Sequence, residues 1–178
     1  MFQLLLSPSN GWEDVRDSAP EPGVLLRRGF YPLLAVVAVA EFVGLLYNKG
    51  FTAEVLLIRA IIDLGAYFVS LYLARILLEM YIPPMMARLA PEELRGRVLT
   101  LILLALGEML IFRLICNLLQ ADVTIIKFLP LYVVLILYKG RDYVGVPADS
   151  TMNFTCLTSL AIVLIPLILH YLLSLILL

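Results

Sequence analysis

The stretch AEVLLIRAIIDLGAYFVSLYLARILLEMY, residues 53–81, decides the fold of this chain. At 1.5 Å per residue, these roughly 29 residues form about 43 Å of helix, longer than the ~30 Å hydrocarbon core of a bilayer. Two oppositely charged pairs inside it are spaced i,i+4, so the partners share a helix face: Arg59 with Asp63, and Arg75 with Glu79. Arg59 and Asp63 fall at membrane depth, where an ionisable side chain is costly unless it faces the protein interior and finds a partner. We therefore expect the other segments to pack around this helix.

Composition places the chain among integral membrane proteins. Its 178 residues are 62% hydrophobic, with a mean hydropathy of +1.00, whereas soluble domains are roughly 45–50% apolar. We predict one all-α membrane domain at 29–178, after a polar N-terminal segment at 1–28. The net charge of −1 leaves no basic patch for phosphates, so we expect the lipid bilayer and no nucleic acid as partner. Cys116 and Cys156 have no metal-like spacing, so we predict no metal site, no cofactor and no disulfide.

Apolar runs and breaker residues divide the membrane domain. Asn48-Lys49-Gly50 is a tight turn that makes the first two spans an antiparallel hairpin, and Pro83-Pro84 ends the second span. Pro91, followed by two glutamates, is typical of a helix start. Pro130 is expected to kink the fourth span. The sequence therefore predicts a bundle of five transmembrane helices, at about 30–47, 53–82, 98–119, 123–138 and 154–178, with a polar loop at 139–153.

The N-terminal segment carries too many breakers for one long helix: Pro8, Gly11, Pro20, Pro22 and Gly23. Trp12 and the apolar residues near the start are of the kind that lie in the membrane interface. The alternative is a loosely ordered tail.

Loop charges indicate the orientation. Only Lys49 lies on one side of the predicted bundle, whereas eight basic residues lie on the other: Arg16, Arg27, Arg28, Arg88, Arg95, Arg97, Lys139 and Arg141. Because cytoplasmic loops carry the excess of Lys and Arg, we predict a cytoplasmic N-terminus and an outside C-terminus.

Short motifs along the chain resemble the bacterial branch of the Yip1 family of integral membrane proteins: Pro8 and Trp12 near the start, Tyr31-Pro32-Leu33 at the first span, and YKGRDYVGVP at 138–147. The resemblance implies five spans, a cytoplasmic N-terminus and, for a bacterial protein, the inner membrane. Eukaryotic members act in vesicle traffic and contact small GTPases. Their functional motifs match no residues here one by one, so the resemblance implies the architecture and not the partner.

One sequence element invites an enzymatic interpretation. Residues 92–97, EELRGR, fit the EExxxR element of the CAAX-type membrane proteases. Those proteases also need histidines, and His170, the only one in the chain, is expected at the opposite membrane face. No GxSxG, HExxH or P-loop motif is present. We therefore predict no catalytic residues and no enzymatic activity, and we interpret His170 as an interhelical hydrogen-bond partner.

Six charged residues at membrane depth form the candidate site: Glu41, Arg59, Asp63, Glu108, Arg113 and Lys127. We expect Arg59 to be held by Asp63 and by Glu41 or Glu108. A structural interpretation is a buried network that fixes helix register, and matched charge favours it. A functional interpretation is a proton or ion path, or a polar cavity for a small substrate or lipid headgroup.

Together these patterns favour a non-enzymatic membrane scaffold, or an assembly or trafficking factor, that binds other membrane proteins or itself. The alternative is a small transporter or channel component. A sealed and fully paired charge cluster would favour the scaffold. An acid that lacks a basic partner and lines a cavity would favour transport.

Overall fold

The structure, a computed structural model, describes residues 2–48, 50–82, 90–119 and 128–178. All regular secondary structure in these ranges is helical. Four helical stretches are long and apolar enough to cross a membrane: Pro22–Tyr47, Ala53–Tyr81, Pro91–Leu119 and Ala148–Leu177. In length and composition, the described part of the chain suits a multi-pass membrane protein.

The described residues form a short N-terminal unit and five helical rods. The N-terminal unit holds α1 (Phe2–Leu6) and α2 (Pro8–Ser18). The rods are, in order: α3 (Pro22–Val24), η1 (Leu25–Phe30), α4 (Tyr31–Ala40), η2 (Glu41–Val43) and α5 (Gly44–Tyr47); α6 (Ala53–Tyr81); α7 (Pro91–Leu119); α8 (Leu129–Val144); and η5 (Ala148–Ser150), α9 (Thr151–Ser159), η6 (Leu160–Leu164) and α10 (Ile165–Leu177).

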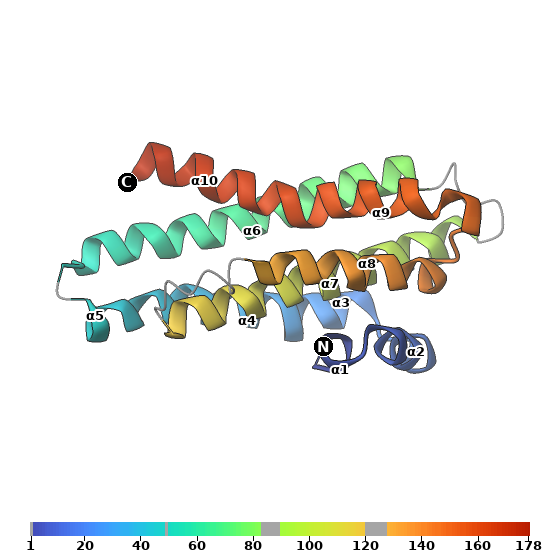
Figure 1. The fold of residues 1–178 in the computed structure, drawn as a ribbon, viewed down its shortest axis with the longest axis horizontal. Helices are drawn as coiled ribbons and strands as arrows, with labels where there is room; N and C mark the ends of the chain where they lie inside the picture. The colour runs from blue at the N-terminus through green and yellow to red at the C-terminus, as the bar shows by residue number, and fades with distance from the viewer. Residues whose placement is uncertain (1, 49, 83–89, 120–127) are drawn as a thin grey trace.

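Successive rods run in opposite directions along the long axis of the bundle (Figure 1). The chain terminus after α10 lies at the same end as α5, which we call the α5 end. The end of α6, the start of α7 and the connection from α8 to α9 lie at the other end, which we call the α9 end. The predicted hairpin of the first two spans is present, because the chain reverses between α5 and α6.

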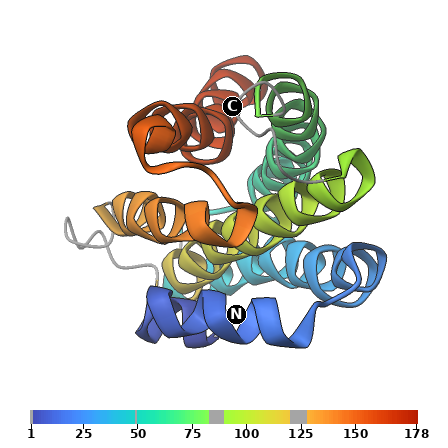
Figure 2. The same ribbon diagram turned by 90° about the vertical axis from the view of Figure 1, so that its right-hand side faces the viewer.

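The central helix of the bundle is α7, and not α6 as the sequence suggested. Every residue from 101 to 110 is buried, and Figure 2 shows α7 with α4, α6 and α8 around it. Helix α6 packs on α4, α7 and α10 but leaves one face open, with Leu57, Ile61 and Phe68 about half exposed. The two charge pairs made α6 conspicuous in the sequence, yet burial follows from apolar side chains on all faces, which α7 has in its middle.

Local signals set the helix ends. Thr52 caps α6, accepting a hydrogen bond from the Val55 amide at 3.3 Å, and α6 ends at Tyr81, as expected. Pro91 opens α7. Gly145, at φ 87°, ends α8 in a left-handed turn that only glycine adopts without strain. The chain therefore turns at Gly145 and reaches η5 through Val146 and Pro147.

Two expectations for this region are wrong. The predicted polar loop at 139–153 is mostly helix, because α8 continues to Val144 and α9 begins at Thr151. The polar residues of this stretch end a helix whose earlier part is apolar. Pro130 does not kink the span, because it lies in the first turn of α8, where no intrahelical hydrogen bond needs its missing N–H. Other predicted features lie outside the described residues: Lys49, Pro83-Pro84, Arg88 and the start of the fourth span at 123–127.

The N-terminal unit is folded, in contrast to the expectation of a loosely ordered tail. Trp12 is buried under α8, where its Nε1 donates a hydrogen bond to the Ile136 carbonyl at 2.8 Å and its ring stacks on Tyr143 with centroids 5.2 Å apart. The chain breaks after α2 at Ala19, in a left-handed conformation. Trp12 is therefore a buried core residue.

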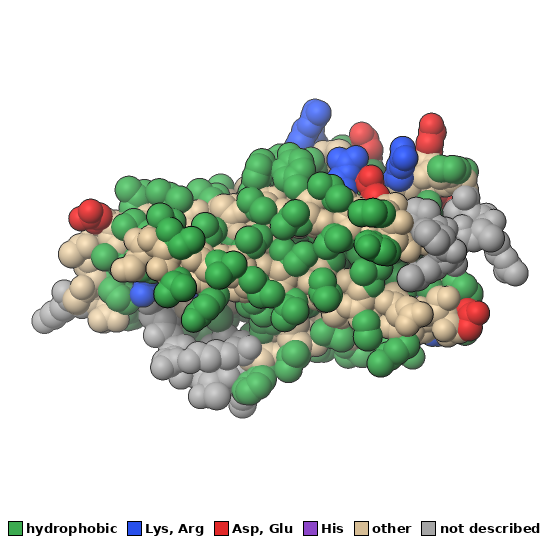
Figure 3. All heavy atoms as spheres, turned by 90° about the horizontal axis from the view of Figure 1, so that it is seen from above, with side chains coloured by type: hydrophobic (Ala, Val, Ile, Leu, Met, Phe, Trp, Pro, Cys, Tyr) green, Lys and Arg blue, Asp and Glu red, His purple; other side chains and the backbone are tan. Residues whose placement is uncertain are grey.

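The surface of the bundle is largely apolar. In the view from above, hydrophobic side chains cover most of the face, and many of the charged ones gather toward one end (Figure 3). Exposed leucines and isoleucines on α6 and α10 form much of this surface, including Ile76, Leu175 and Ile176. Such extended apolar surface is rare on soluble monomers and is expected where lipid replaces water.

Candidate functional site

A polar cluster lies inside the apolar rods, and Arg113 on α7 is at its centre. The guanidinium contacts two carboxylates from two other rods. Its Nε lies 3.0 Å from Oδ2 of Asp63 on α6, and its Nη2 lies 3.0 Å from Oε1 of Glu41, the first residue of η2. Asp63 is fully buried and Glu41 is almost so. One arginine therefore joins three rods by charge-assisted hydrogen bonds, the stronger kind.

Two further side chains complete the cluster. Nδ1 of His170, on α10, lies 3.1 Å from Oδ1 of Asp63. Asn117, one turn after Arg113, donates to the Val37 carbonyl at 3.2 Å and to Asp63 Oδ2 at 3.4 Å. We call these five residues the Asp63 cluster: Glu41, Asp63, Arg113, Asn117 and His170. It links four of the five rods.

The first rod changes its winding where it enters the Asp63 cluster. At Glu41 the α-helix tightens into the 3₁₀ segment η2. A 3₁₀ turn inside a longer helix rotates the side chains that follow and often marks a hinge or a sequence under strain. Here the tightened turn contains Glu41 itself, whose carboxylate faces Arg113.

The charges of the Asp63 cluster nearly cancel. Two carboxylates face one guanidinium, which leaves one negative charge when His170 is neutral and none when it is protonated. Asp63 carries most of the contacts, since Arg113, Asn117 and His170 all reach its carboxylate. A buried ion set of this kind is tolerated in an apolar interior only when its members satisfy one another.

The expected pairing of Arg59 with Asp63 is wrong. The Arg59 guanidinium lies over the ring of Phe51, 4.4 Å from its centroid, and the ion pairs found among the described residues do not include Arg59. Asp63 points toward α7, whereas Arg59 stands on a half-exposed side of the helix. The second pair in α6 does form, with Nε of Arg75 2.7 Å from Oε1 of Glu79.

Glu108 stands apart from the Asp63 cluster. Its side chain is fully buried on α7, and neither carboxyl oxygen has a hydrogen-bond partner among the described residues. Five helical positions separate it from Arg113, which turns it toward a different face of α7. Lys127, the remaining residue of the predicted set, lies outside the described residues. The structure thus brings together Glu41, Asp63 and Arg113 and separates Arg59 and Glu108 from them.

Asn117 was not among the residues predicted for the Asp63 cluster, and no particular partner was predicted for His170. His170 does make an interhelical polar contact, with Asp63 on α6. The signal for Asn117 was its i,i+4 spacing from Arg113 on one apolar helix, which puts the two on one face. The signal for His170 was a titratable side chain in an otherwise uncharged span.

A pocket of about 230 Å³ opens beside the Asp63 cluster. Arg113 and the hydroxyl-bearing Tyr67 line it among apolar side chains that include Phe112 and Leu167. Glu108 is not part of its lining. The described residues contain no group of three His, Cys, Asp or Glu side chains that could hold a metal ion.

The residues of the protease-like element are engaged elsewhere. The Glu93 carboxylate pairs with Arg97 at 2.6 Å, at the α9 end, while His170 contacts Asp63. The element and the histidine therefore belong to two separate sets of contacts.

Comparison with protein-family models, with curated proteins and with solved structures finds no match for this chain. Fold and site define its class as an α-helical protein that suits a multi-pass membrane location and contains a buried ionic cluster.

Proposed function

We propose that this chain is a non-enzymatic integral membrane protein of Yip1-like architecture, acting as a scaffold or as an assembly or trafficking factor for other membrane proteins. The observation that carries the proposal is the pairing within the Asp63 cluster. Arg113 on α7 is held by two carboxylates from two other rods, and His170 on α10 connects a fourth rod through Asp63. Charges held in this way fix the rods against one another, which a protein that presents a constant surface to partners requires.

The proposed topology has five spans, with the N-terminus in the cytoplasm and the C-terminus outside. Two observations support it. The five rods alternate in direction, and α8, at 16 residues, is about 24 Å long. Arg97 and Arg141 lie at the α9 end, where the positive-inside rule places the cytoplasm. For a bacterial protein, this membrane is the inner membrane.

The scaffold proposal is tested by purification from native membranes. A tagged chain at its natural expression level is cross-linked in intact cells, solubilised in mild detergent and purified, beside a tagged multi-pass protein of similar abundance. We expect a membrane protein, or a second copy of this chain, to co-purify in near-stoichiometric amount with this chain and not with the control. Purification of the chain alone, with and without cross-linking, would contradict the scaffold.

A second candidate function, transport, is favoured by Glu108 alone. A buried carboxyl without a hydrogen-bond partner among the described residues is typical of a proton- or ion-binding position in a membrane. The test uses proteoliposomes with a pH-sensitive dye inside and an imposed proton or sodium gradient. A scaffold leaves the dye response the same as in empty liposomes. A proton or sodium flux that is lost in Glu108→Gln would contradict the scaffold proposal and identify the protein as a transporter.

A further inference from the structure

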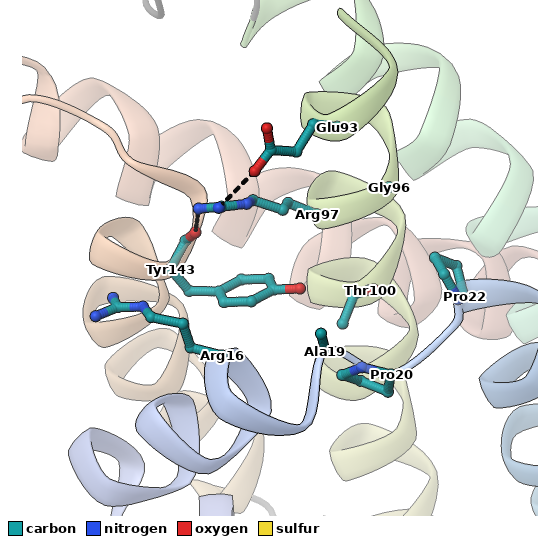
Figure 4. Close-up of a pocket in the computed structure, with 9 residues that line it drawn as sticks. All are labelled: Arg16, Ala19, Pro20, Pro22, Glu93, Gly96, Arg97, Thr100 and Tyr143. Atoms are coloured by element: carbon teal, nitrogen blue, oxygen red, sulfur yellow. Dashed lines mark hydrogen bonds and ion pairs between the residues drawn. The ribbon is translucent and has the colours of Figure 1, made fainter. Parts of the chain in front are cut away.

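A second pocket, of about 240 Å³, lies at the α9 end between α2, α7 and α8 (Figure 4). Arg16 comes from α2, Arg97 and Thr100 from α7, and Tyr143 from α8. The connection from α2 to α3, with Pro20, forms the opposite wall. This pocket is separate from the Asp63 cluster and shares no residue with it.

The polar groups of this pocket are held in place before any ligand arrives. Nη1 of Arg97 donates to the Tyr143 carbonyl at 2.8 Å, and Nη2 lies 2.6 Å from Glu93 Oε1. These bonds use two of the five N–H donors of a guanidinium, so Arg97 keeps donors for a ligand. Its guanidinium carbon lies 5.8 Å from the centroid of the Tyr143 ring, and Trp12 stacks on the same ring. The arginine is therefore fixed by side chains from α7 and α8.

The Tyr143 hydroxyl points toward Thr100 and lies in the pocket (Figure 4). Burial raises the pKa of Tyr143, so the hydroxyl remains protonated and able to donate at neutral pH. Arg16 is an exposed side chain at the rim, on the helix that also carries Trp12. The pocket therefore offers the Arg97 guanidinium and a phenolic donor against one carboxylate, that of Glu93, while the Arg16 side chain at the rim extends away from the Tyr143 hydroxyl (Figure 4).

The position of the pocket matches the level of lipid headgroups in the proposed topology. The apolar part of α7 begins at Val98, one residue after Arg97, and the first rod becomes apolar after Arg28. On the other side of the α2–α3 connection, a second hollow is lined by Arg27 and Arg28 together with Glu21. Both hollows are thus basic and lie where the apolar rods meet water.

We propose that the Arg97 pocket binds a phosphate group, with Arg97 and the Tyr143 hydroxyl as donors and with Arg16 as a further positive charge at the rim. Arginine suits phosphate because its planar donors match two phosphate oxygens. The group is supplied either by the headgroup of an anionic phospholipid or by a soluble phosphate, and the two share this chemistry. The binding site is independent of the scaffold role, since it involves neither the Asp63 cluster nor a protein partner.

Trp12, the only tryptophan of the chain, reports on this pocket because its ring stacks on Tyr143. The full chain in a neutral maltoside detergent is titrated with three probes, namely dihexanoyl phosphatidylglycerol, dihexanoyl phosphatidylcholine and inorganic phosphate. Trp12 emission and calorimetry are followed on the same samples. We expect saturable binding of the anionic lipid, about tenfold tighter than that of the zwitterionic one. Saturation by inorganic phosphate at equal concentration supports the site and identifies the soluble source, whereas saturation by the lipid alone identifies the headgroup.

Three substitutions separate the pocket from general attraction to a basic surface. Arg97→Gln should weaken phosphatidylglycerol binding at least tenfold, and Arg16→Gln should weaken it about threefold without touching a packed contact. Arg95→Gln is the matched control, because Arg95 is exposed on the same helix and does not line the pocket. Equal losses in Arg16→Gln and Arg95→Gln would overturn the site, as would equal affinity for the two lipids or no saturable response to any probe by either method.

Discussion

At the scale of single residues, the buried charged side chains of α7 differ in whether they have an ionic partner. Arg113 is surrounded by acids from two other rods, whereas Glu108, on the same helix, has no partner among the described residues. Stability should therefore respond in opposite directions when the two side chains are removed.

Arg113→Leu should destabilise the protein by roughly 3–5 kcal/mol, because it leaves Glu41 and Asp63 buried without compensation. Adding Asp63→Asn should restore part of the loss. Arg59→Leu is the matched control and should cost about 1 kcal/mol or less, since its guanidinium lies over the Phe51 ring and not against a carboxylate. Thermal unfolding in detergent measures all three. If Arg59→Leu lowers the melting temperature as far as Arg113→Leu, the assignment of the central cation to Arg113 is wrong.

Glu108→Leu should raise the melting temperature in detergent. A buried polar group without a partner costs about 1–3 kcal/mol, and an apolar side chain of similar size removes that cost. Glu108→Gln, which keeps the polar atoms, should give a smaller gain or none. A clear loss of stability in Glu108→Leu would mean that the carboxyl has a partner in the membrane-embedded protein.

At the scale of elements, two glycines allow close approaches: Gly140 lets α2 lie against α8, and Gly11 lets α2 lie against α1. A Cβ on Gly140 would lie 2.8 Å from Leu101 Cδ1 and 2.9 Å from the Trp12 ring, and one on Gly11 would lie 2.8 Å from the Leu4 backbone. Gly140 lies in the YKGRDYVGVP stretch at 138–147. Its lack of a side chain lets Trp12 approach α8.

Gly140→Ala should separate α2 from α8. The overpacking should cost roughly 1–3 kcal/mol and outweigh the better helix propensity of alanine. Emission from Trp12 should shift to the red as the ring becomes wetter. Gly29→Ala is the control, because a Cβ there meets nothing within 4 Å. An unchanged Trp12 spectrum in Gly140→Ala would show that α2 does not depend on this close approach.

At the scale of the whole molecule, the rods alternate in direction, and Arg97 and Arg141 both lie at the α9 end. Five rods put α5 and the end of α10 on the same side of the bundle, away from Arg97 and Arg141. Cys116, late in α7, and Cys156, early in α9, accordingly lie toward opposite ends, and both are free thiols.

A reporter that is active only outside the cytoplasm should work when fused after Leu178. The same reporter should be inactive when inserted between Gly145 and Ala148, in the connection from α8 to α9. The physical reason is the excess of arginine and lysine beside that connection. A cytoplasmic reporter in the same two places provides the control and should give the inverse pattern. Activity of the first reporter at 145–148 would contradict the five-span model.

The amino-acid sequence by itself determined that the chain is all-α and suited to a membrane, the approximate positions of its long apolar helices and the gathering of basic residues at one end, but not α1, α2 or the helical residues within 139–153. The limits of α6 and the start of α7 follow from signals within a few residues, namely Thr52 as a cap and Pro91 as a first residue. These features are local, so they do not depend on how the helices are arranged.

Only the tertiary structure decided which charges meet and which helix is central. The i,i+4 spacing made Arg59 the expected partner of Asp63. The rotation of α6 instead turns Asp63 toward α7, where it forms an ion pair with Arg113. The burial of Trp12 likewise depends on Gly140, far away in sequence. Spacing along one helix fixes only which residues share a face. The partner of a buried charge depends on how neighbouring helices are rotated, and packing across the whole bundle sets that rotation.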